Sequence, residues 1–234
     1  MKIAGLQKMT LLDFPGKVAC TVFLDGCNFR CPFCHNTPLL TGQAEAFMTE
    51  EEFFAFLQKR QGILDGVCIT GGEPTLQKDL TEFLGKIKAL GYLVKLDTNG
   101  YRPDVLQSVV EQGLVDYVAM DIKNGPNHYS TTTGVAIDLK KIEESIKVLA
   151  SEKINYEFRT TICNPLHDAQ SITQMGQWLL QLTNGKGVKA LYLQSFVDRE
   201  SVKMAGFSAP KEEDLESYKK ALIHVAETVV VRGV

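Results

Sequence analysis

The sequence has little that would place it in a membrane, in an export pathway or on nucleic acid. Its longest apolar run, Val18–Leu24, has the length of a strand, whereas a helix needs about 20 apolar residues to cross a bilayer. The segment Met1–Gly16 carries Lys2, Lys8 and Asp13 and no apolar block, unlike a signal peptide. The formal net charge is −3 without a long basic run, which argues against binding phosphate backbones. We therefore expect a cytoplasmic protein with no membrane or nucleic-acid partner.

Disulfides are not expected either, although the chain contains six cysteines. A chain of 234 residues without an export signal keeps its thiols reduced, and clustered thiols are then more often ligands or catalysts. Cys20, Cys68 and Cys163 each stand alone in an apolar stretch, where cysteine usually acts as a small buried hydrophobic residue. The remaining three cysteines are clustered and are the candidates for chemistry.

Apolar runs of strand length alternate with amphipathic stretches of helical length, with no linker or low-complexity segment between them. The predicted strands are Val18–Leu24, Val67–Thr70, Tyr92–Asp97, Val115–Asp121, Ile154–Thr161 and Lys189–Phe196. The predicted helices are Thr49–Arg60, Lys78–Leu90, Pro103–Gln112, Asp138–Ser151, Asp168–Leu182 and Lys211–Glu227. Several begin with a start signal, namely the capping box Thr49 with Glu52, Pro103 in the first turn, and the N-caps Asp138 and Asp168. We expect one domain, residues 1–234.

Strands that alternate with helices predict a parallel α/β sheet with right-handed crossovers. Two arrangements fit this pattern, an open doubly wound sheet and a curved sheet that forms an incomplete barrel. Both place functional residues at the carboxyl ends of the strands. Candidate motifs do follow four of the predicted strands: Cys27, Gly71-Gly72-Glu73-Pro74, Asp97-Thr98-Asn99-Gly100 and Asp121-Ile122-Lys123.

The first of these motifs holds Cys27, Cys31 and Cys34 at CxxxCxxC spacing. A cubane cluster usually takes four thiolates, so three thiolates from one loop leave the fourth iron open to a substrate. A zinc site made of these cysteines and His35 is the alternative. Adjacent Cys34 and His35 are awkward for tetrahedral chelation, and structural zinc usually draws ligand pairs from two segments, so the spacing favours a [4Fe–4S] cluster.

With Phe33 before its third cysteine, this motif resembles the signature of the radical S-adenosylmethionine superfamily. The continuation Cys34-His35-Asn36 is similar to the subgroup that activates glycyl-radical enzymes, including pyruvate formate-lyase and anaerobic ribonucleotide reductase. The likeness covers roughly Lys17 to Phe196, and Leu11-Leu12-Asp13-Phe14-Pro15-Gly16 resembles proteins grouped as ribonucleotide reductase activators. The family implies an α/β fold, an incomplete (β/α)6 barrel of parallel strands, or partial TIM barrel.

The resemblance implies one [4Fe–4S] cluster with Cys27, Cys31 and Cys34 as metal ligands and catalytic residues, and S-adenosylmethionine on the open iron. One electron would then cleave the cofactor to a 5′-deoxyadenosyl radical, which abstracts a hydrogen atom from a glycine Cα of a partner glycyl-radical enzyme. Cluster and cofactor carry this chemistry, while the protein positions them in a dry pocket. A low-potential electron donor such as flavodoxin or ferredoxin is implied as a second partner.

Two further motifs resemble the family's contacts with S-adenosylmethionine. Gly71, Gly72 and Glu73 match the GGE motif, in which glycines let a ligand approach the backbone and the carboxylate can pair with the cofactor's ammonium group. Phe33 and His35 flank the last cluster ligand, and the family places them near the adenine. These residues are therefore predicted to bind the cofactor.

The next two strand ends are predicted to bind the cofactor or a cation. Carboxylates at neighbouring strand ends repel each other unless a cation or hydrogen bonds separate them. Asp97, Thr98 and Asp121, with the backbone of Ala119, resemble a monovalent-cation site of the pyruvate formate-lyase activator. Thr98, Asn99 and Asp121 are also predicted to contact S-adenosylmethionine, although Asn-Gly is by itself a common turn.

Three polar residues complete the predicted site. Lys123 matches a family lysine near the cofactor and the incoming glycine loop, and the resemblance implies a catalytic and cofactor-binding role, with a solvated surface lysine as the alternative. Arg159 lies inside a predicted strand, where an unpaired charge is costly, so it needs a partner such as the cofactor. Gln194 is placed near the end of a strand, beside the adenosine.

One stretch departs from the pyruvate formate-lyase activators, which carry a histidine shortly after the sixth strand. Here it reads Leu193-Gln194-Ser195-Phe196-Val197-Asp198, which leaves the partner protein open. No cysteine lies between Asn36 and Val67, so a single cluster is predicted. Two alternatives to an activase remain, a radical enzyme acting on a small molecule, as in 7-carboxy-7-deazaguanine synthesis, and a non-catalytic zinc or iron–sulfur module.

Overall fold

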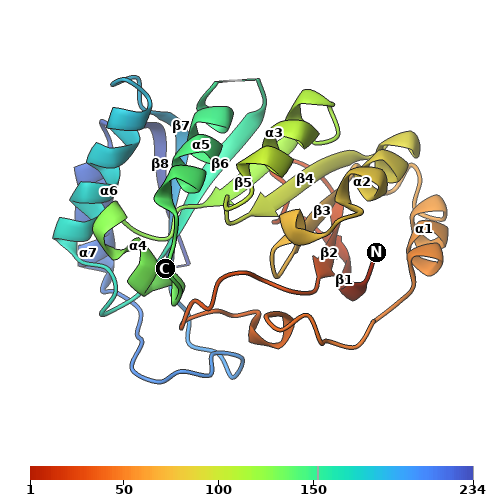
Figure 1. Cartoon of the computed structure of the whole chain (residues 1–234), viewed down its shortest axis with the longest axis horizontal. Helices are drawn as coiled ribbons and strands as arrows, with labels where there is room; N and C mark the ends of the chain where they lie inside the picture. Colours follow the sequence, from red (N-terminus) through yellow and green to blue (C-terminus); the bar gives the residue numbers. More distant parts are fainter. Residues whose placement is uncertain (152, 234) are drawn as a thin grey trace. The chain divides into compact units, whose positions relative to one another are not determined.

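The computed structural model describes residues 1–151 and 153–233 (Figure 1). The chain forms two compact units. Unit 1 comprises residues 1–28 and 38–119, and unit 2 comprises residues 29–37 and the chain from Met120 onward. The cysteine loop is therefore divided between the two units.

Unit 1 is built on β1 (Ile3–Thr10), β2 (Ala19–Leu24), β3 (Gly66–Gly71), β4 (Leu93–Thr98) and the start of β5 (Tyr117–Asp121). β1 pairs with β2 antiparallel, whereas β2, β3 and β4 pair in parallel. Its helices are α1 (Glu50–Gln58), α2 (Leu80–Ala89) and α3 (Pro103–Glu111), with a 3-10 turn at Pro74–Leu76. Leu24 pairs with Gly71, so β2 and β3 end at the same level.

The core of unit 1 follows from the apolar faces of its helices. Phe53 of α1 and Phe83 of α2 are buried and stack with ring centroids 5.5 Å apart. Burying a side chain of this kind stabilises the fold by about 2 kcal/mol. Val22, Ile69 and Leu96 on the central strands are completely buried, as expected for parallel strands with covered faces.

Unit 2 contains the end of β5 and the strands β6 (Asn155–Ile162), β7 (Val188–Ser195) and β8 (Ala226–Arg232). β6, β7 and β8 pair in parallel. The helices are α4 (Tyr129–Thr133), α5 (Leu139–Ala150), α6 (Ala169–Leu182) and α7 (Glu212–Leu222), with 3-10 turns at Thr37–Leu39, which reaches into unit 1, and at Pro126–His128. Trp178 of α6 packs edge-on against buried Tyr129 of α4.

The predicted fold class is confirmed. The strand order follows the chain order from β1 to β8, and the described sheet does not return from β8 to β1. The six predicted strands correspond to β2 through β7. The predicted capping box at Thr49 and the N-caps Asp138 and Asp168 also form as hydrogen bonds. A single domain over residues 1–234 stays a prediction.

Both ends of the described sheet were missed from the sequence. β1 was missed because Gly5 and the exposed run Gln7–Met9 interrupt its apolar pattern. The helix predicted over Lys211–Glu227 is wrong at its end, because α7 stops at Leu222 and β8 begins at Ala226. The β-branched run Thr228–Val231 carried the strand signal there. No helix in the described ranges is long and apolar enough to span a membrane.

Candidate functional site

The glycines after β3 allow two strand ends of unit 1 to touch. Gly71 has a φ of +120°, and a Cβ there would lie 2.3 Å from the Leu24 carbonyl oxygen. A Cβ on Gly72 would lie 2.2 Å from the Gly26 carbonyl oxygen. The Glu73 amide donates to that same carbonyl over 2.8 Å. These glycines are therefore required to join the β3 turn to the start of the cysteine loop, whether or not a ligand also approaches them.

Glu73 holds the ends of β3 and β4 together. Its carboxylate is 1% exposed and accepts hydrogen bonds from the Thr98 hydroxyl over 2.8 Å and from the Asn99 amide over 2.6 Å. The amide and hydroxyl of Thr75 donate to the same carboxylate. Burial raises the pKa of Glu73, against the opposing effect of these donors. All of these donors are neutral, so Glu73 acts here as a brace between two loops.

Asn99 connects this brace to the first cysteine. Its side-chain amide donates to the Asn28 carbonyl oxygen over 2.9 Å and lies 3.9 Å from the Cys27 sulfur. Its own carbonyl oxygen accepts from the Tyr101 amide over 3.0 Å, which closes the turn after β4. The predicted residues Cys27, Glu73 and Asn99 are thus brought together in unit 1, through contacts that include their own backbone.

Asp97 already has a cationic partner in unit 1. The Lys95 ammonium group, 2% exposed, forms a short ion pair with Asp97. Burying a lysine is tolerated only when its charge is compensated, so this pair belongs to the architecture of β4. Thr98 uses its hydroxyl on Glu73. Ala119, whose backbone was predicted to join the cation site, is completely buried on β5.

The other two cysteines form a tight turn in unit 2. The Cys34 amide donates to the Cys31 carbonyl over 3.1 Å. Burial raises the pKa of the Cys31 thiol to about 11, although the nearby Lys123 charge lowers it, and burial also raises the pKa of Cys34. Phe33, between them, is buried and meets the His167 ring edge-on at 6.4 Å. The turn presents two partly shielded thiols beside a positive charge.

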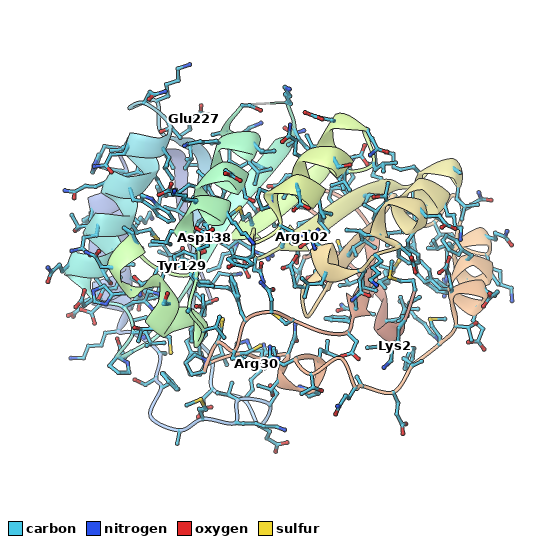
Figure 2. All side chains as sticks on the ribbon, viewed as in Figure 1. Lys2, Arg30, Arg102, Tyr129, Asp138 and Glu227 are labelled. Atoms are coloured by element: carbon cyan, nitrogen blue, oxygen red, sulfur yellow. The ribbon has the colours of Figure 1, made fainter. Side chains whose placement is uncertain are left out.

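This turn is anchored on α4 through its preceding residue. The Arg30 amide donates to the Thr133 carbonyl over 2.8 Å. Gly134 follows with a φ of +69°, and a Cβ there would lie 2.3 Å from the Arg30 carbonyl oxygen. Only glycine admits this approach without displacing the loop. Figure 2 labels Arg30 and, on α4, the buried Tyr129.

His35 is held by the segment that follows β7. Its Nε2 lies 2.6 Å from the Val197 carbonyl oxygen, and its ring stacks on Phe196 at 5.7 Å and 17°. A nitrogen that faces a carbonyl oxygen carries a proton, so Nε2 is a donor and not a metal ligand in this arrangement. The contact orients the His35 ring and excludes Nε2 as a metal ligand, whereas Nδ1 keeps its lone pair, so this contact does not decide between zinc and an iron–sulfur cluster.

Asp121 and two cations form an ion-paired group at the end of β5. The Lys123 ammonium donates to Asp121 over 2.8 Å, and Arg159 Nε donates to its other oxygen over 3.0 Å. Burial alone would raise the pKa of Asp121, but Lys123 and Arg159 lower it to about 2. Burial would lower the pKa of Lys123, but Asp121 and Cys31 raise it. Arg159, which was predicted to need a partner such as the cofactor, is ion-paired with Asp121. Lys123 is no solvated surface lysine, since its side chain is 17% exposed.

His167 is a residue of this group that sequence reasoning missed. Its side chain is 2% exposed, its Nδ1 accepts from the Cys163 amide over 3.2 Å, and its Nε2 donates to the Lys123 carbonyl over 2.8 Å. Burial lowers its pKa, which favours this neutral form. His167 links Lys123 to Phe33 of the cysteine turn. A single histidine before the helix cap Asp168 gave no signal in the sequence.

Gln194 lies half-buried on β7, beside an arginine that sequence reasoning also missed. In the parallel register Gln194 pairs with Thr161 of β6 and with Arg232 of β8. The Arg232 guanidinium stacks 3.5 Å above the Tyr192 ring and lies 3.5 Å from the buried carboxylate of Glu157. Arg232 was missed because β8 itself was missed.

The isolated cysteines are buried hydrophobic residues, as predicted. Cys20, Cys68 and Cys163 are completely buried. Burial raises the pKa of each thiol to about 12, so none is a nucleophile at neutral pH. All six cysteines are free thiols, which leaves Cys27, Cys31 and Cys34 as candidate ligands.

The residues around these three cysteines fit an iron–sulfur cluster. Three free thiols in one loop supply the donor set for three irons. Next to Cys27, the side-chain amide nitrogen of Asn28 is buried and has no hydrogen-bond partner within residues 1–151 and 153–233. An unpaired buried N–H is costly, and a sulfur acceptor at this position would satisfy it.

Comparison with known proteins identifies the family. Residues 21–172 match the model of the Radical SAM superfamily. The chain is 30% identical over 99% of its length to a protein of Methanocaldococcus jannaschii, covering 96% of it, whose name assigns it provisionally to the glycyl-radical enzyme activating enzymes. It is 25% identical to the pyruvate formate-lyase-activating enzyme of Clostridium pasteurianum, over 95% of this chain and 98% of that one.

Solved structures agree on the fold. A domain of a pyruvate formate-lyase-activating enzyme from Bacteroides vulgatus superposes with a TM-score of 0.58 at 20% identity, covering 72% of this chain and 99% of that one. The chain belongs to the radical S-adenosylmethionine superfamily and is an enzyme. Membership implies a [4Fe–4S] cluster and S-adenosylmethionine as cofactors.

Proposed function

We propose that this enzyme activates a glycyl-radical enzyme by removing a hydrogen atom from a glycine Cα of that partner. The extent of similarity carries the proposal. Three relatives named as activating enzymes match this chain from end to end, over 94–99% of its length, although a fourth matches only 61% of it. A match of whole chains includes the segments outside residues 21–172, which the superfamily model does not cover.

A small-molecule substrate is supported over a shorter stretch. The 7-carboxy-7-deazaguanine synthase of Koribacter versatilis is 34% identical, but over only 58% of this chain and 58% of that one. The GTP 3′,8-cyclase of Thermococcus kodakarensis matches 62% of this chain and 47% of its own. Similarity confined to that share of each chain is what a common cofactor site alone would produce.

The residues of both units have separate tasks in this proposal. Cys27, Cys31 and Cys34 would hold the cluster, with Asn28 donating to it. When bound, the cluster and S-adenosylmethionine supply the one-electron chemistry that removes a hydrogen atom from carbon. Phe33 shields the cysteine turn from water, which a carbon-centred radical reaction requires.

The ion-paired group would set the charge beside the cysteine turn. Lys123 favours the thiolate form of Cys31, which is the form that binds iron. Asp121 holds Lys123 in place, and Arg159 neutralises the remaining charge of Asp121. A ligand carboxylate could take over one donor from Lys123 or Arg159 without leaving either cation unpaired, which supports their predicted contacts with S-adenosylmethionine.

The remaining finer proposals concern the cation, the partners and the location. Lys95 already forms an ion pair with Asp97, and both Lys123 and Arg159 form ion pairs with Asp121. A monovalent cation would therefore have to compete with these side chains for the two carboxylates. We propose anaerobic ribonucleotide reductase as the partner, a flavodoxin or ferredoxin as the electron donor, and a cytoplasmic location, which the free thiols support. In the segment that suggested this partner, Leu12 is 89% exposed and available for contact, whereas Phe14 is buried.

An electron paramagnetic resonance experiment tests the proposal. The protein would be reconstituted with iron and sulfide without oxygen, reduced, and mixed with S-adenosylmethionine and the candidate glycyl-radical enzyme. We expect a glycyl radical signal on the partner and, with an α-deuterated glycine partner, deuterium in the 5′-deoxyadenosine produced. The Cys31→Ser variant should give neither.

The outcome also separates the alternatives. Formation of 5′-deoxyadenosine without deuterium from any glycyl-radical partner, but with label from a purine precursor, would assign a small-molecule substrate instead. A protein that binds zinc, or a cluster whose spectrum ignores S-adenosylmethionine, would refute enzymatic function at this site. The Cys68→Ser variant is the matched control, because Cys68 is a buried cysteine outside the loop.

A further inference from the structure

Another carboxylate stands at a strand end of unit 1, and no sequence motif singled it out. Asp25 follows β2 directly and precedes Cys27 by two positions. It is 5% exposed. A buried carboxylate is costly unless donors satisfy it, so its contacts show what the fold uses it for.

Three donors from separate parts of unit 1 converge on the Asp25 carboxylate. The Gly26 amide donates to Oδ1 over 3.0 Å, and the Ala44 amide donates to Oδ2 over 3.0 Å. The ammonium group of Lys2, the residue before β1, donates to Oδ2 over 3.2 Å (Figure 2). Asp25 therefore joins the chain before β1, the end of β2 and the segment that follows the cysteine loop.

These contacts close the neck of the cysteine loop, which we define as residues 25–27 and 39–44. Two backbone hydrogen bonds pair the sides of the neck, from the Gly26 amide to the Leu39 carbonyl over 2.7 Å and from the Cys27 amide to the Leu40 carbonyl over 3.2 Å. The bond between Asp25 and the Ala44 amide adds a third link. Closing a loop orders the chain at an entropic cost, and these bonds offset that cost.

The neck is also joined to the turn after β3. The Gln77 side-chain amide donates to the Asp25 backbone carbonyl over 2.6 Å. Together with the bond from the Glu73 amide to the Gly26 carbonyl, it ties this turn to the backbone that carries Cys27. A shift of Asp25 would therefore move Cys27 relative to Glu73.

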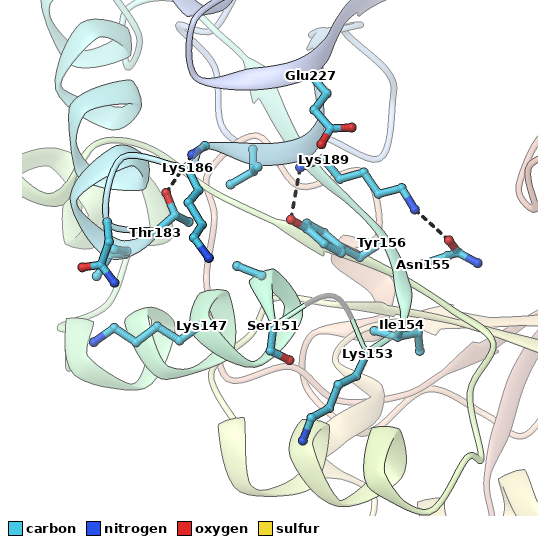
Figure 3. Close-up of a pocket in the computed structure, with 15 residues that line it drawn as sticks. Lys147, Ser151, Lys153, Ile154, Asn155, Tyr156, Thr183, Lys186, Lys189 and Glu227 are labelled. Atoms are coloured by element: carbon cyan, nitrogen blue, oxygen red, sulfur yellow. Dashed lines mark hydrogen bonds between the residues drawn. The ribbon is translucent and has the colours of Figure 1, made fainter.

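Convergence of donors distinguishes Asp25 from the polar group at the amino ends of β6 and β7. There the side chains of Lys147, Lys153 and Lys189 surround a cavity of unit 2 and point apart, as Figure 3 shows. Side chains that diverge fix no common position, whereas three donors on one buried carboxylate hold three backbone segments in register.

We propose that Asp25 is a positioning residue for the iron–sulfur cluster: it holds the neck closed and so fixes the backbone that presents the Cys27 sulfur. The role requires a carboxylate, because the NH2 group of an asparagine would face the amide N–H of Ala44 or of Gly26. The inference rests on the cluster that family membership implies, and not on the partner protein.

Iron release from the reconstituted protein tests this role without using activity. The cluster would be assembled from iron and sulfide without oxygen, and transfer of iron to a chelator would be followed in time. We expect Asp25→Asn to release iron at least about tenfold faster, because buried donors lose their acceptor and the neck opens more often. Gln77→Ala removes only the bond to the Asp25 carbonyl and should accelerate release about threefold. Lys2→Gln removes a half-exposed partner and should change the rate less than about twofold.

Asp116→Asn is the matched control. The Asp116 carboxylate also accepts from one lysine, Lys88, over 2.7 Å and from one backbone amide, that of Val94, over 2.7 Å, but it does so near the amino end of β4. The substitution should lower the free energy of unfolding of the iron-free protein in urea. Iron release should stay within about twofold of the unchanged protein, because the site lies away from the neck.

Hydrogen exchange of the iron-free protein separates this role from a general loss of stability. In Asp25→Asn we expect exchange to accelerate more at the Gly26 and Cys27 amides than at the Val94 amide. Equal acceleration at all three amides would overturn the proposal, and so would iron release no faster than in Asp116→Asn.

Two further outcomes count against the proposal. If Lys2→Gln accelerates iron release as much as Asp25→Asn does, the lysine charge and not the closed neck holds the cluster. If Asp25→Asn does not fold, Gln77→Ala decides, and an unchanged release rate in that variant overturns the role of the neck. Neither measurement needs a partner protein, so failure here leaves the proposed activase function to its own test.

Discussion

Glu73 and Asp121 occupy equivalent positions, one in each unit, yet their environments are opposite. Each carboxylate belongs to a predicted motif that lies at or just beyond the end of a parallel strand. Glu73 is 1% exposed and accepts only from neutral donors. Asp121 is paired with Lys123 and Arg159. Accordingly the pKa of Glu73 is raised, because burial outweighs its hydrogen bonds, whereas the pKa of Asp121 is lowered.

The difference separates a structural role from an electrostatic one. Glu73 ties two loops of unit 1 together through three donors on Oε1 and one donor on Oε2. Asp121 holds the flexible side chain of Lys123 beside Cys31 through an ion pair. We therefore expect mutations of Glu73 and Asp121 to have different consequences, which can be measured on iron-free protein.

The largest effect is expected for Asp121→Asn. Asp121 is 29% exposed in a partly buried ion-paired group, and removing it takes away the carboxylate that both Lys123 and Arg159 contact, which is destabilising where the remaining charge is shielded from water. We expect the free energy of unfolding in urea at pH 7 to fall by about 3 kcal/mol. Asp104→Asn is the matched control, because its pair with Arg102 is exposed, and it should cost less than about 1 kcal/mol. Equal losses in the two variants would show that Asp121 is not distinct from a surface carboxylate.

The same variant should change the pH dependence of stability. The folded pKa of Asp121 is about 2, against an ordinary value of 3.8, so its stabilisation is present above pH 3.8 and lost as pH falls toward 2. The difference in unfolding free energy between the unchanged protein and Asp121→Asn should shrink by about 2 kcal/mol between pH 5 and pH 2. A difference that stays constant over this range would contradict the ion-paired arrangement.

A smaller loss is expected for Glu73→Gln. The amide keeps the shape of the side chain but turns an N–H group toward neighbours that are themselves donors, such as the Asn99 amide. We expect a loss of about 2 kcal/mol in urea unfolding at pH 7. Glu51→Gln, at an exposed position in the first turn of α1, should cost at most about 0.5 kcal/mol. If Glu73→Gln were neutral, the carboxylate would not be the brace described above.

The smallest effect is expected for His167→Phe. The ring that meets Phe33 is kept, but the Lys123 carbonyl and the Cys163 amide lose their partner. We expect a loss of about 1 kcal/mol in thermal unfolding and faster alkylation of Cys31, whose turn packs on this ring. His128→Phe, at an exposed histidine, should change neither. Unchanged alkylation in His167→Phe would mean that His167 does not support the cysteine turn.

Much of the fold could be predicted because each central element carries its own local signal. β2 through β7 are rich in buried β-branched or apolar residues, and the N-caps Thr49, Asp138 and Asp168 mark the starts of their helices. β1 lacks such a run, since Gln7–Met9 are exposed. β8 contains a β-branched run, but it follows α7 so closely that its first residues were assigned to the predicted helix Lys211–Glu227.

The candidate site likewise has parts with a local sequence signal and parts without one. The cysteine spacing, the GGE motif and the strand-end acids are local patterns, so the sequence alone identified them and the family they belong to. It could not reveal His167 or Arg232, whose partners Lys123 and Glu157 lie 44 and 75 positions away along the chain. It also could not distinguish Glu73 from Asp121, because a carboxylate's pKa depends on which charges fold against it.

What the sequence by itself determined is the chemistry: three free thiols in one loop, a parallel α/β frame and strand ends rich in polar groups. Only the tertiary structure decided how those groups are used. It assigned Glu73 to neutral donors and Asp121 to two cations. The physical reason is that covalent spacing fixes which atoms are available, whereas burial and electrostatic pairing arise from residues distant in the chain.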